Sequence, residues 1–297
     1  MPALLATALM AGVGCSPNAH ATLAQHTVSN AGAALPSWFT GVWTREWIER
    51  KGVRSDLFDV HYLQTPSLFG DMRVPRDRPA LAQAKSFADL TDADLLQLAR
   101  QRGFTGSSTV SDARATWHHE VDFQPPDSAE DIGRIERIDD AHMFEHALDS
   151  SYIESWRSIS SGDGRFLAVR VERAGRLDRV LLVAGDHFLF VRNREKDLPM
   201  AESLDSLIVA TRATRAQIIE YLDCEFSAGR VHGSGAAWEI QRSTLPWREG
   251  KHLDFVDELH ISSRGGLVPR GASTERWSVP VNTLTRAQLR ALFPSRK

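Results

Sequence analysis

Residues that favour β-strands alternate with polar residues over most of the chain from Trp38 onward, in short runs separated by turn residues. In a strand, every second side chain lies on the same face, so each run predicts a strand with one buried face. The first three runs are 41–49, 58–64 and 69–74. Three strands at such close spacing predict an antiparallel meander.

Further strand-like runs fill the rest of the chain. They are 114–122, 131–138, 142–147, 152–160, 166–172, 179–184, 187–192, 238–242 and 252–260. Pairs of Pro, Gly or Asp separate most of them, which is typical of tight turns. Short strands at this spacing favour an antiparallel barrel or sandwich over a parallel α/β fold.

Helical signals are few and short. Thr91 is a good N-cap for a helix that runs to Arg100, because Asp94 stands at the third helical position. Three more short helices are predicted at 200–210, 215–222 and 285–291. The predicted fold class is therefore mostly β, with a few short helices.

The N-terminal segment has a different composition. Residues 2–14 form an apolar run that ends at Cys15, too short for a membrane span of about 20 residues. It resembles a signal peptide, with lipidation of Cys15 or cleavage after Ala21. Against this, no Lys or Arg precedes Arg45, and Gly12 stands where a lipoprotein signal places a branched residue. We expect residues 1–36 to be a leader or extension of a cytoplasmic protein, with export or a lipid anchor as the alternative.

Composition excludes some functions. The net charge of −3 predicts no broad basic surface for nucleic acid or an anionic membrane. With Cys224 the one cysteine of the body, neither a disulfide framework nor a Cys-x-x-Cys metal site is expected. The sequence thus predicts no metal and no cofactor. Eight tryptophans are more informative, because several of them together often line a core or a ligand cavity.

The run 152–156 carries the first candidate site. Alternation places Tyr152, Glu154 and Trp156 on one face. A carboxylate between two inward aromatic rings would have a raised pKa and could act as a general acid. The structural alternative is that Glu154 faces solvent or pairs with an arginine across the sheet.

The run 117–122 carries the second candidate site. Trp117 and His119 share one face, and His118 and Asp122 share the other. A metal held by His118, Asp122 and a distant third ligand is one interpretation, but adjacent histidines on a strand cannot chelate together. The alternative is one buried and one exposed histidine.

Glu145 is the third candidate. If its face is inward, Glu145 and Glu154 converge on neighbouring strands and need a shared proton, a ligand or an arginine. Arg45, between Trp43 and Trp47 on one predicted face, is a candidate counter-charge. A structural salt bridge is the alternative.

Several short stretches are similar to the fungal casein-kinase-interacting (Hri-type) family, which has a double lipocalin-like, or calycin-like, barrel. They occur in the same order over most of 38–242, and comprise 62–65 with 73–75, Trp117 with 131–133, 154–156, 180–183 with 188–189, and 238–240. The resemblance implies two antiparallel barrels and no known cofactor. The family has no established reaction, so it assigns no catalytic residue, but it suggests a protein partner.

Together these features predict a leader (1–36), a first barrel-like unit with an inserted helix (37–138) and a second with a C-terminal helix (139–297). Two functions stay open. One is a binding protein for a small apolar or aromatic ligand; its predicted lining is Trp43, Arg45, Trp47, Trp117, Tyr152 and Trp156. The other is a cofactor-free isomerase, hydratase or lyase; its predicted acid–base residues are Glu154, Glu145 and His119.

Overall fold

The computed structural model describes residues 35–81, 83–126, 129–232, 237–271 and 273–294. The leader with Cys15 and Ala21 lies outside the described residues. Within the described ranges, no helix is both long and apolar enough to cross a membrane.

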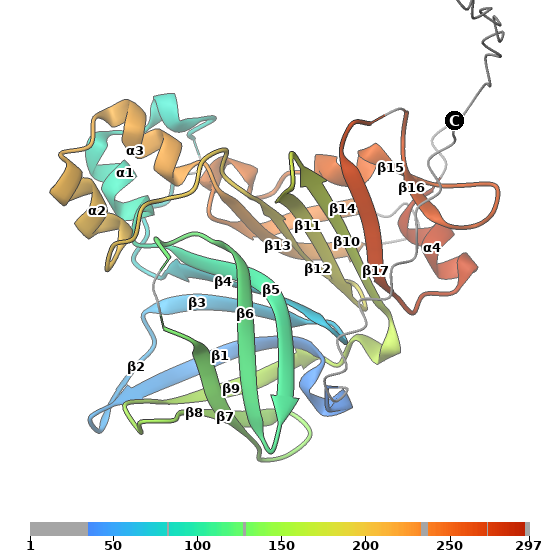
Figure 1. Cartoon of the computed structure of the whole chain (residues 1–297), viewed down its shortest axis with the longest axis horizontal. Coiled ribbons are helices and arrows are strands. Elements are labelled where there is room, and N and C mark those ends of the chain that lie inside the picture. Colours follow the sequence, from blue (N-terminus) through green and yellow to red (C-terminus); the bar gives the residue numbers. More distant parts are fainter. Residues whose placement is uncertain (1–34, 82, 127–128, 233–236, 272, 295–297) are drawn as a thin grey trace, which may run out of the picture.

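A closed antiparallel barrel of eight strands forms the N-terminal part of the fold (Figure 1). Its strands, in order around the barrel, are β1 (Gly41–Arg50), β3 (Phe58–Gln64), β4 (Leu68–Pro75), β5 (Arg102–Ser111), β6 (Arg114–Asp122), β7 (Asp131–Arg137), β8 (His142–Ala147) and β9 (Ile153–Ser160). Strand β9 pairs with β1 and closes the barrel, and the short β2 (Val53–Ser55) pairs with the end of β1.

The second layer is a six-stranded antiparallel sheet. Its order is β14 (Ala237–Ser243), β13 (Glu225–His232), β12 (His187–Arg192), β11 (Arg176–Ala184), β10 (Phe166–Arg173) and β17 (Arg276–Asn282). The two outer strands do not pair with each other, so this sheet stays open where the sequence predicted a second barrel. The predicted mostly-β barrel fold is confirmed, with one barrel and one open sheet.

Four short helices and a small hairpin complete the fold. They are α1 (Asp92–Leu98), α2 (Leu204–Thr211), α3 (Arg215–Leu222), α4 (Arg286–Leu292), and the hairpin of β15 (Leu259–Ile261) with β16 (Leu267–Pro269). Thr91 caps α1 as predicted, with Asp94 completing the capping box. The predicted strand 252–260 is wrong, because most of it forms the 3-10 turn η5 (Asp254–Glu258).

Sheet membership changes at Ser160. Strands β8 and β9 belong to the barrel, although the predicted domain boundary at residue 138 assigned them to the second unit. The boundary moves because β9 finds its partner in β1, far away in the chain. Whether the two parts fold independently stays a prediction.

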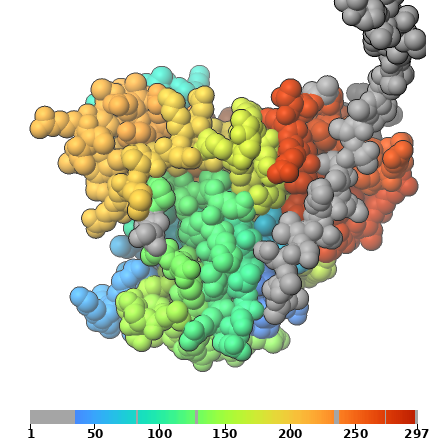
Figure 2. Space-filling model, viewed as in Figure 1, coloured from blue at the N-terminus to red at the C-terminus, as the bar shows by residue number. Residues whose placement is uncertain are grey.

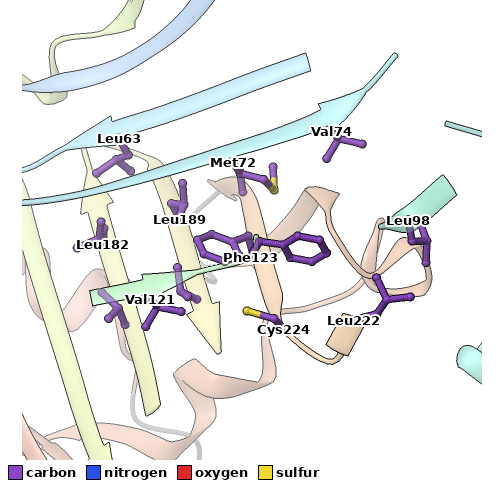
Figure 3. Packing of buried hydrophobic residues seen from close by; sticks show 14 of the residues in the cluster. Leu63, Met72, Val74, Leu98, Val121, Phe123, Leu182, Leu189, Leu222 and Cys224 are labelled. Carbon is purple, nitrogen blue, oxygen red and sulfur yellow. The ribbon is translucent and has the colours of Figure 1, made fainter. Parts of the chain in front are cut away.

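A continuous apolar core joins the outer wall of the barrel to the second sheet (Figure 3). Leu63 and Met72 of the barrel pack with Leu182 and Leu189 of the sheet. The layers approach closely at Gly70, where a Cβ atom would lie 2.6 Å from a methyl carbon of Leu189. Helices α1, α2 and α3 extend this core beyond the barrel, and Figure 2 shows them as a lobe beside the strands. The second sheet and the helices therefore pack against the outside of the barrel wall.

Candidate functional site inside one end of the barrel

One end of the barrel interior is a packed aromatic core. The 3-10 turn η1 (Ser37–Phe39) inserts the fully buried ring of Phe39, which lies 6.1 Å from the ring of Tyr62 and 6.5 Å from that of Trp117. Trp43 Nε1 donates a hydrogen bond to the Phe39 carbonyl (3.1 Å), and Trp117 Nε1 donates to Tyr62 Oη (2.9 Å). Two residues of the predicted ligand lining, Trp43 and Trp117, therefore belong to this aromatic layer.

The opposite end of the interior carries charges. Arg45 on β1 forms a buried ion pair with Glu154 on β9. Beside them on β4, Arg73 donates two hydrogen bonds to the buried carboxylate of Asp71 (2.8 and 3.0 Å) and lies 3.9 Å from Glu154. We call this set, with Glu145, the charged layer.

Glu145 and Glu154 stand directly opposite each other on β8 and β9, and both are buried. Burial, followed by repulsion from Glu154 and Asp131, raises the pKa of Glu145 well above its usual range. Tyr152 Oη donates a hydrogen bond to Glu145 Oε1 (3.0 Å). The pair therefore combines a carboxyl of raised pKa with a second one that is ion-paired to an arginine.

Gly133 on β7 makes room for Glu145. A Cβ atom on this residue would lie 2.9 Å from Glu145 Cγ and 3.3 Å from the ring of Trp117. Any larger residue would push the Glu145 carboxyl out of its position against the aromatic layer. The glycine thus sets where the charged layer begins.

His119 forms the edge of the charged layer. Its Nδ1 bonds to Asp122 (2.7 Å), its Nε2 bonds to Asp131 (3.0 Å), and its ring stacks on Phe104 at 4.4 Å between centroids. Burial by itself would lower the pKa of His119, but the hydrogen bonds to the two carboxylates raise it to about 9. The imidazolium therefore serves as a cation between two acids.

Bulges change two predicted faces. Between Arg45 and Trp47 the register of β1 against β9 shifts by one residue. Trp47 consequently lies on the outer wall, with its ring 5.8 Å from that of Phe144, so its predicted place beside Arg45 is wrong.

A second bulge lies in β6, where the register against β5 skips Glu120. This irregularity brings His119 and Asp122 together, whereas strict alternation predicted opposite faces. Among the described residues, no group of three His, Cys, Asp or Glu side chains could hold a metal ion.

Two buried polar atoms of the interior have no hydrogen-bond partner within the described part of the chain: Glu154 Oε2 and Trp156 Nε1. Their residues are two apart on β9, and both are at most 3% exposed. An unsatisfied buried polar group costs about 1–3 kcal/mol, so such atoms need a reason. One is a hydrogen-bond acceptor and the other a donor.

Sequence reasoning overlooked Asp71, Arg73 and Phe104. The alternation Phe69, Asp71, Arg73 in a run bounded by Leu68 and Pro75 was a usable signal, because it puts two charges on the same face as an aromatic ring. The closure of the barrel, which places this face opposite Glu154, is not visible in any local pattern.

The geometry defines an antiparallel β-barrel with an aromatic layer at one end of its interior and a charged layer at the other. No protein-family model matches the chain, and no curated protein matches it. Among solved structures, the crystal structure of the uncharacterized protein YLR301w from Saccharomyces cerevisiae is similar, with 11% identity and a TM-score of 0.47 over 82% of this chain and 98% of that one. The resemblance to the casein-kinase-interacting family stays a prediction.

Proposed function

We propose that the barrel binds a small molecule at its charged layer, through Glu154 and Trp156. The observation that carries the proposal is the pair of unpartnered buried atoms, Glu154 Oε2 and Trp156 Nε1. A ligand hydroxyl has the chemistry to satisfy both, since it can donate to the carboxylate oxygen and accept from the indole N–H. A primary amide offers the same combination.

Access supports this location. Side chains at the charged end of the barrel reach solvent: Arg73 is 18%, His119 27% and Asp131 34% exposed. The aromatic layer at the other end, by contrast, is capped by the buried Phe39. A ligand therefore enters from the charged end and meets rings and charges together, as in many small-molecule sites.

The test is fluorine NMR of protein labelled with fluorotryptophan. The Trp156 resonance is the one that disappears in the Trp156→Phe variant. Phenol and benzamide are titrated as hydroxyl and amide probes and toluene as the apolar control. Phenol and benzamide should shift the Trp156 signal saturably, toluene should not, and Glu154→Gln should weaken both polar probes. A Trp156 signal that responds to none of them, as expected if one trapped water satisfies both atoms, contradicts the proposal.

A second function is favoured by the carboxyl pair. Burial raises the pKa of Glu145 well above its usual range and Glu154 faces Arg45, so the two could act as acid and base on one substrate. This arrangement suits a cofactor-free isomerase. Keto–enol tautomerisation of phenylpyruvate provides a test, in which Glu145→Gln and Glu154→Gln should each lower an enzymatic rate by about 100-fold. A rate equal to that in buffer excludes this activity for the probe.

A further inference from the structure

The rim of the charged end carries two arginines that no carboxylate neutralises. Arg50 ends β1 and Arg102 begins β5, so antiparallel connectivity puts both at the same end of the barrel. In the described part of the chain, neither forms an ion pair. Each lies over an aromatic ring instead, Arg50 at 5.5 Å from the centroid of Tyr152 and Arg102 at 5.9 Å from that of Phe58.

Their surroundings add positive charge. The rim partly shields the Arg102 guanidinium from water although the residue is exposed, and this desolvation, followed by the neighbouring charges of Arg73, Arg50 and Arg45, lowers its pKa. Arg73 lies over a third ring, Phe104, at 5.2 Å. Three guanidinium groups thus share one rim, and the carboxylates of Asp71 and Glu154 are already bonded to Arg73 and Arg45.

Each of the three arginines of this rim lies over an aromatic ring. A flat ligand could stack on Phe58 or Tyr152 while its charged group lies in the plane of the guanidinium forks, the geometry in which arginine binds carboxylates. A positively charged ligand group is disfavoured at the rim, because it would be repelled by Arg50 and Arg102. Deeper in the barrel a negatively charged group is disfavoured instead, because it would be repelled by Glu154.

We infer that the ligand is a small aromatic anion, with its acidic group between Arg50 and Arg102 and a hydroxyl or amide directed at Glu154 and Trp156. This inference rests on the proposed function and adds the charge of the ligand to it. Para-hydroxybenzoate is the simplest probe with both features. Benzoate lacks the inner hydroxyl, and para-hydroxybenzamide lacks the charge.

Calorimetric titration of the whole protein separates the two claims. The wild type should bind para-hydroxybenzoate at least about tenfold more tightly than para-hydroxybenzamide, as charge-assisted hydrogen bonds require. In the double variant Arg50→Gln, Arg102→Gln the ratio of these two affinities should fall to about one, and high salt should reduce the ratio in the wild type.

Arg54→Gln is the matched control. Arg54 also lies over an aromatic ring, Trp47 at 3.9 Å, but on the outer wall and paired with Glu49. This variant should keep the tenfold preference. All three proteins should unfold at similar urea concentrations, since Arg50, Arg54 and Arg102 are exposed.

Each outcome decides one claim. Equal affinity for the anion and the amide overturns the inference but leaves the proposed function in place. If the protein binds para-hydroxybenzoate more tightly than para-hydroxybenzamide but no more tightly than benzoate, the anion site at the rim is supported and the inner contact with Glu154 is contradicted. No binding of para-hydroxybenzoate at all, with a Trp156 signal that still responds to phenol, overturns the inference alone.

Discussion

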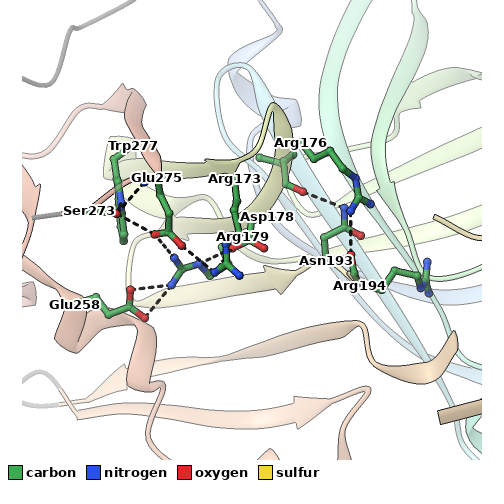
Figure 4. A network of polar contacts seen from close by, with 11 residues as sticks. Arg173, Arg176, Asp178, Arg179, Asn193, Arg194, Glu258, Ser273, Glu275 and Trp277 are labelled. Carbon is green, nitrogen blue, oxygen red and sulfur yellow. Dashed lines mark hydrogen bonds and ion pairs between the residues drawn. The ribbon is translucent and has the colours of Figure 1, made fainter. Parts of the chain in front are cut away.

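Two buried arginines, Arg45 and Arg179, have very different surroundings. Arg179 on β11 donates to both oxygens of Glu258 (2.9 and 2.8 Å) and to Glu275 (2.6 Å) (Figure 4). Its guanidinium also lies near the rings of Phe255 and Trp277. This network links β11 of the second sheet to Glu258, at the end of η5, and to Glu275, just before β17.

Arg45, inside the barrel, pairs with one carboxylate, and that carboxylate keeps an unpartnered oxygen. The same chain therefore builds one complete ion network around a buried arginine, partly open to solvent at Glu258, and one buried network that is incomplete. An ion cluster that stabilises the fold needs all of its hydrogen bonds satisfied, because desolvated charges are stabilising only under that condition. The incomplete network is better explained as a site than as a support for the fold.

The largest expected effect is that of Arg45→Met. It leaves the buried Glu154 without its hydrogen-bonded partner and with Arg73, at 3.9 Å, as its remaining cation, which should lower the free energy of unfolding by about 3 kcal/mol. The double variant Arg45→Met, Glu154→Leu should recover most of the loss, because an apolar pair needs no partners. Urea unfolding of both variants gives the comparison, and a double variant as unstable as the single one would make the ion pair structural.

Arg179→Met should have a smaller effect, about 1–3 kcal/mol, because solvent can reach the carboxylates that it leaves. Glu258, for instance, has a side chain that is 48% exposed. Affinity for para-hydroxybenzoate should not change. An affinity loss in this variant would show that the two networks are coupled.

The raised pKa of His119 predicts that the free energy of unfolding depends on pH. Its pKa is raised to about 9 in the folded protein, so the stabilisation is complete below the ordinary pKa of 6.5 and is lost as the pH rises through about 9. Relative to His119→Gln, the wild type should lose about 1–2 kcal/mol over this window, after allowance for solvent screening. Urea unfolding of both proteins at a series of pH values measures it, and parallel pH profiles would contradict the assignment.

Glu145 predicts the smallest effect. Because its pKa is raised in the folded state, ionisation destabilises the wild type as the pH rises above the ordinary value of 4.5. Glu145→Gln should therefore gain stability relative to the wild type with rising pH. Urea unfolding of both proteins at a series of pH values measures this gain. A relative stability that falls with pH would show that Glu145 is ionised.

Much of this arrangement could be predicted from alternation. The runs 41–49, 58–64 and 142–147 match β1, β3 and β8, and the inward positions of Glu145, Glu154 and Trp156 follow from period-2 geometry. By contrast, β5 escaped prediction because its run Arg102–Ser111 is rich in Gly and Ser, which are poor strand formers.

What could not be predicted depends on partners distant in sequence. The bulge that moves Trp47 outward is set by the register of β1 against β9, and the bulge beside His119 by that of β6 against β5. The open second sheet is similar in kind, since each of its strands looks locally like a barrel strand. Alternation fixes faces within a strand, while closure and register depend on the whole sheet.

The affinity of the Arg45→Met, Glu154→Leu double variant for para-hydroxybenzoate tests the central claim most directly. If the charged layer is a binding site, this variant should fold at least as stably as Arg45→Met and bind the probe more than about tenfold less tightly than the wild type. A folded double variant with wild-type affinity would contradict the account, because the charged layer would then take no part in binding.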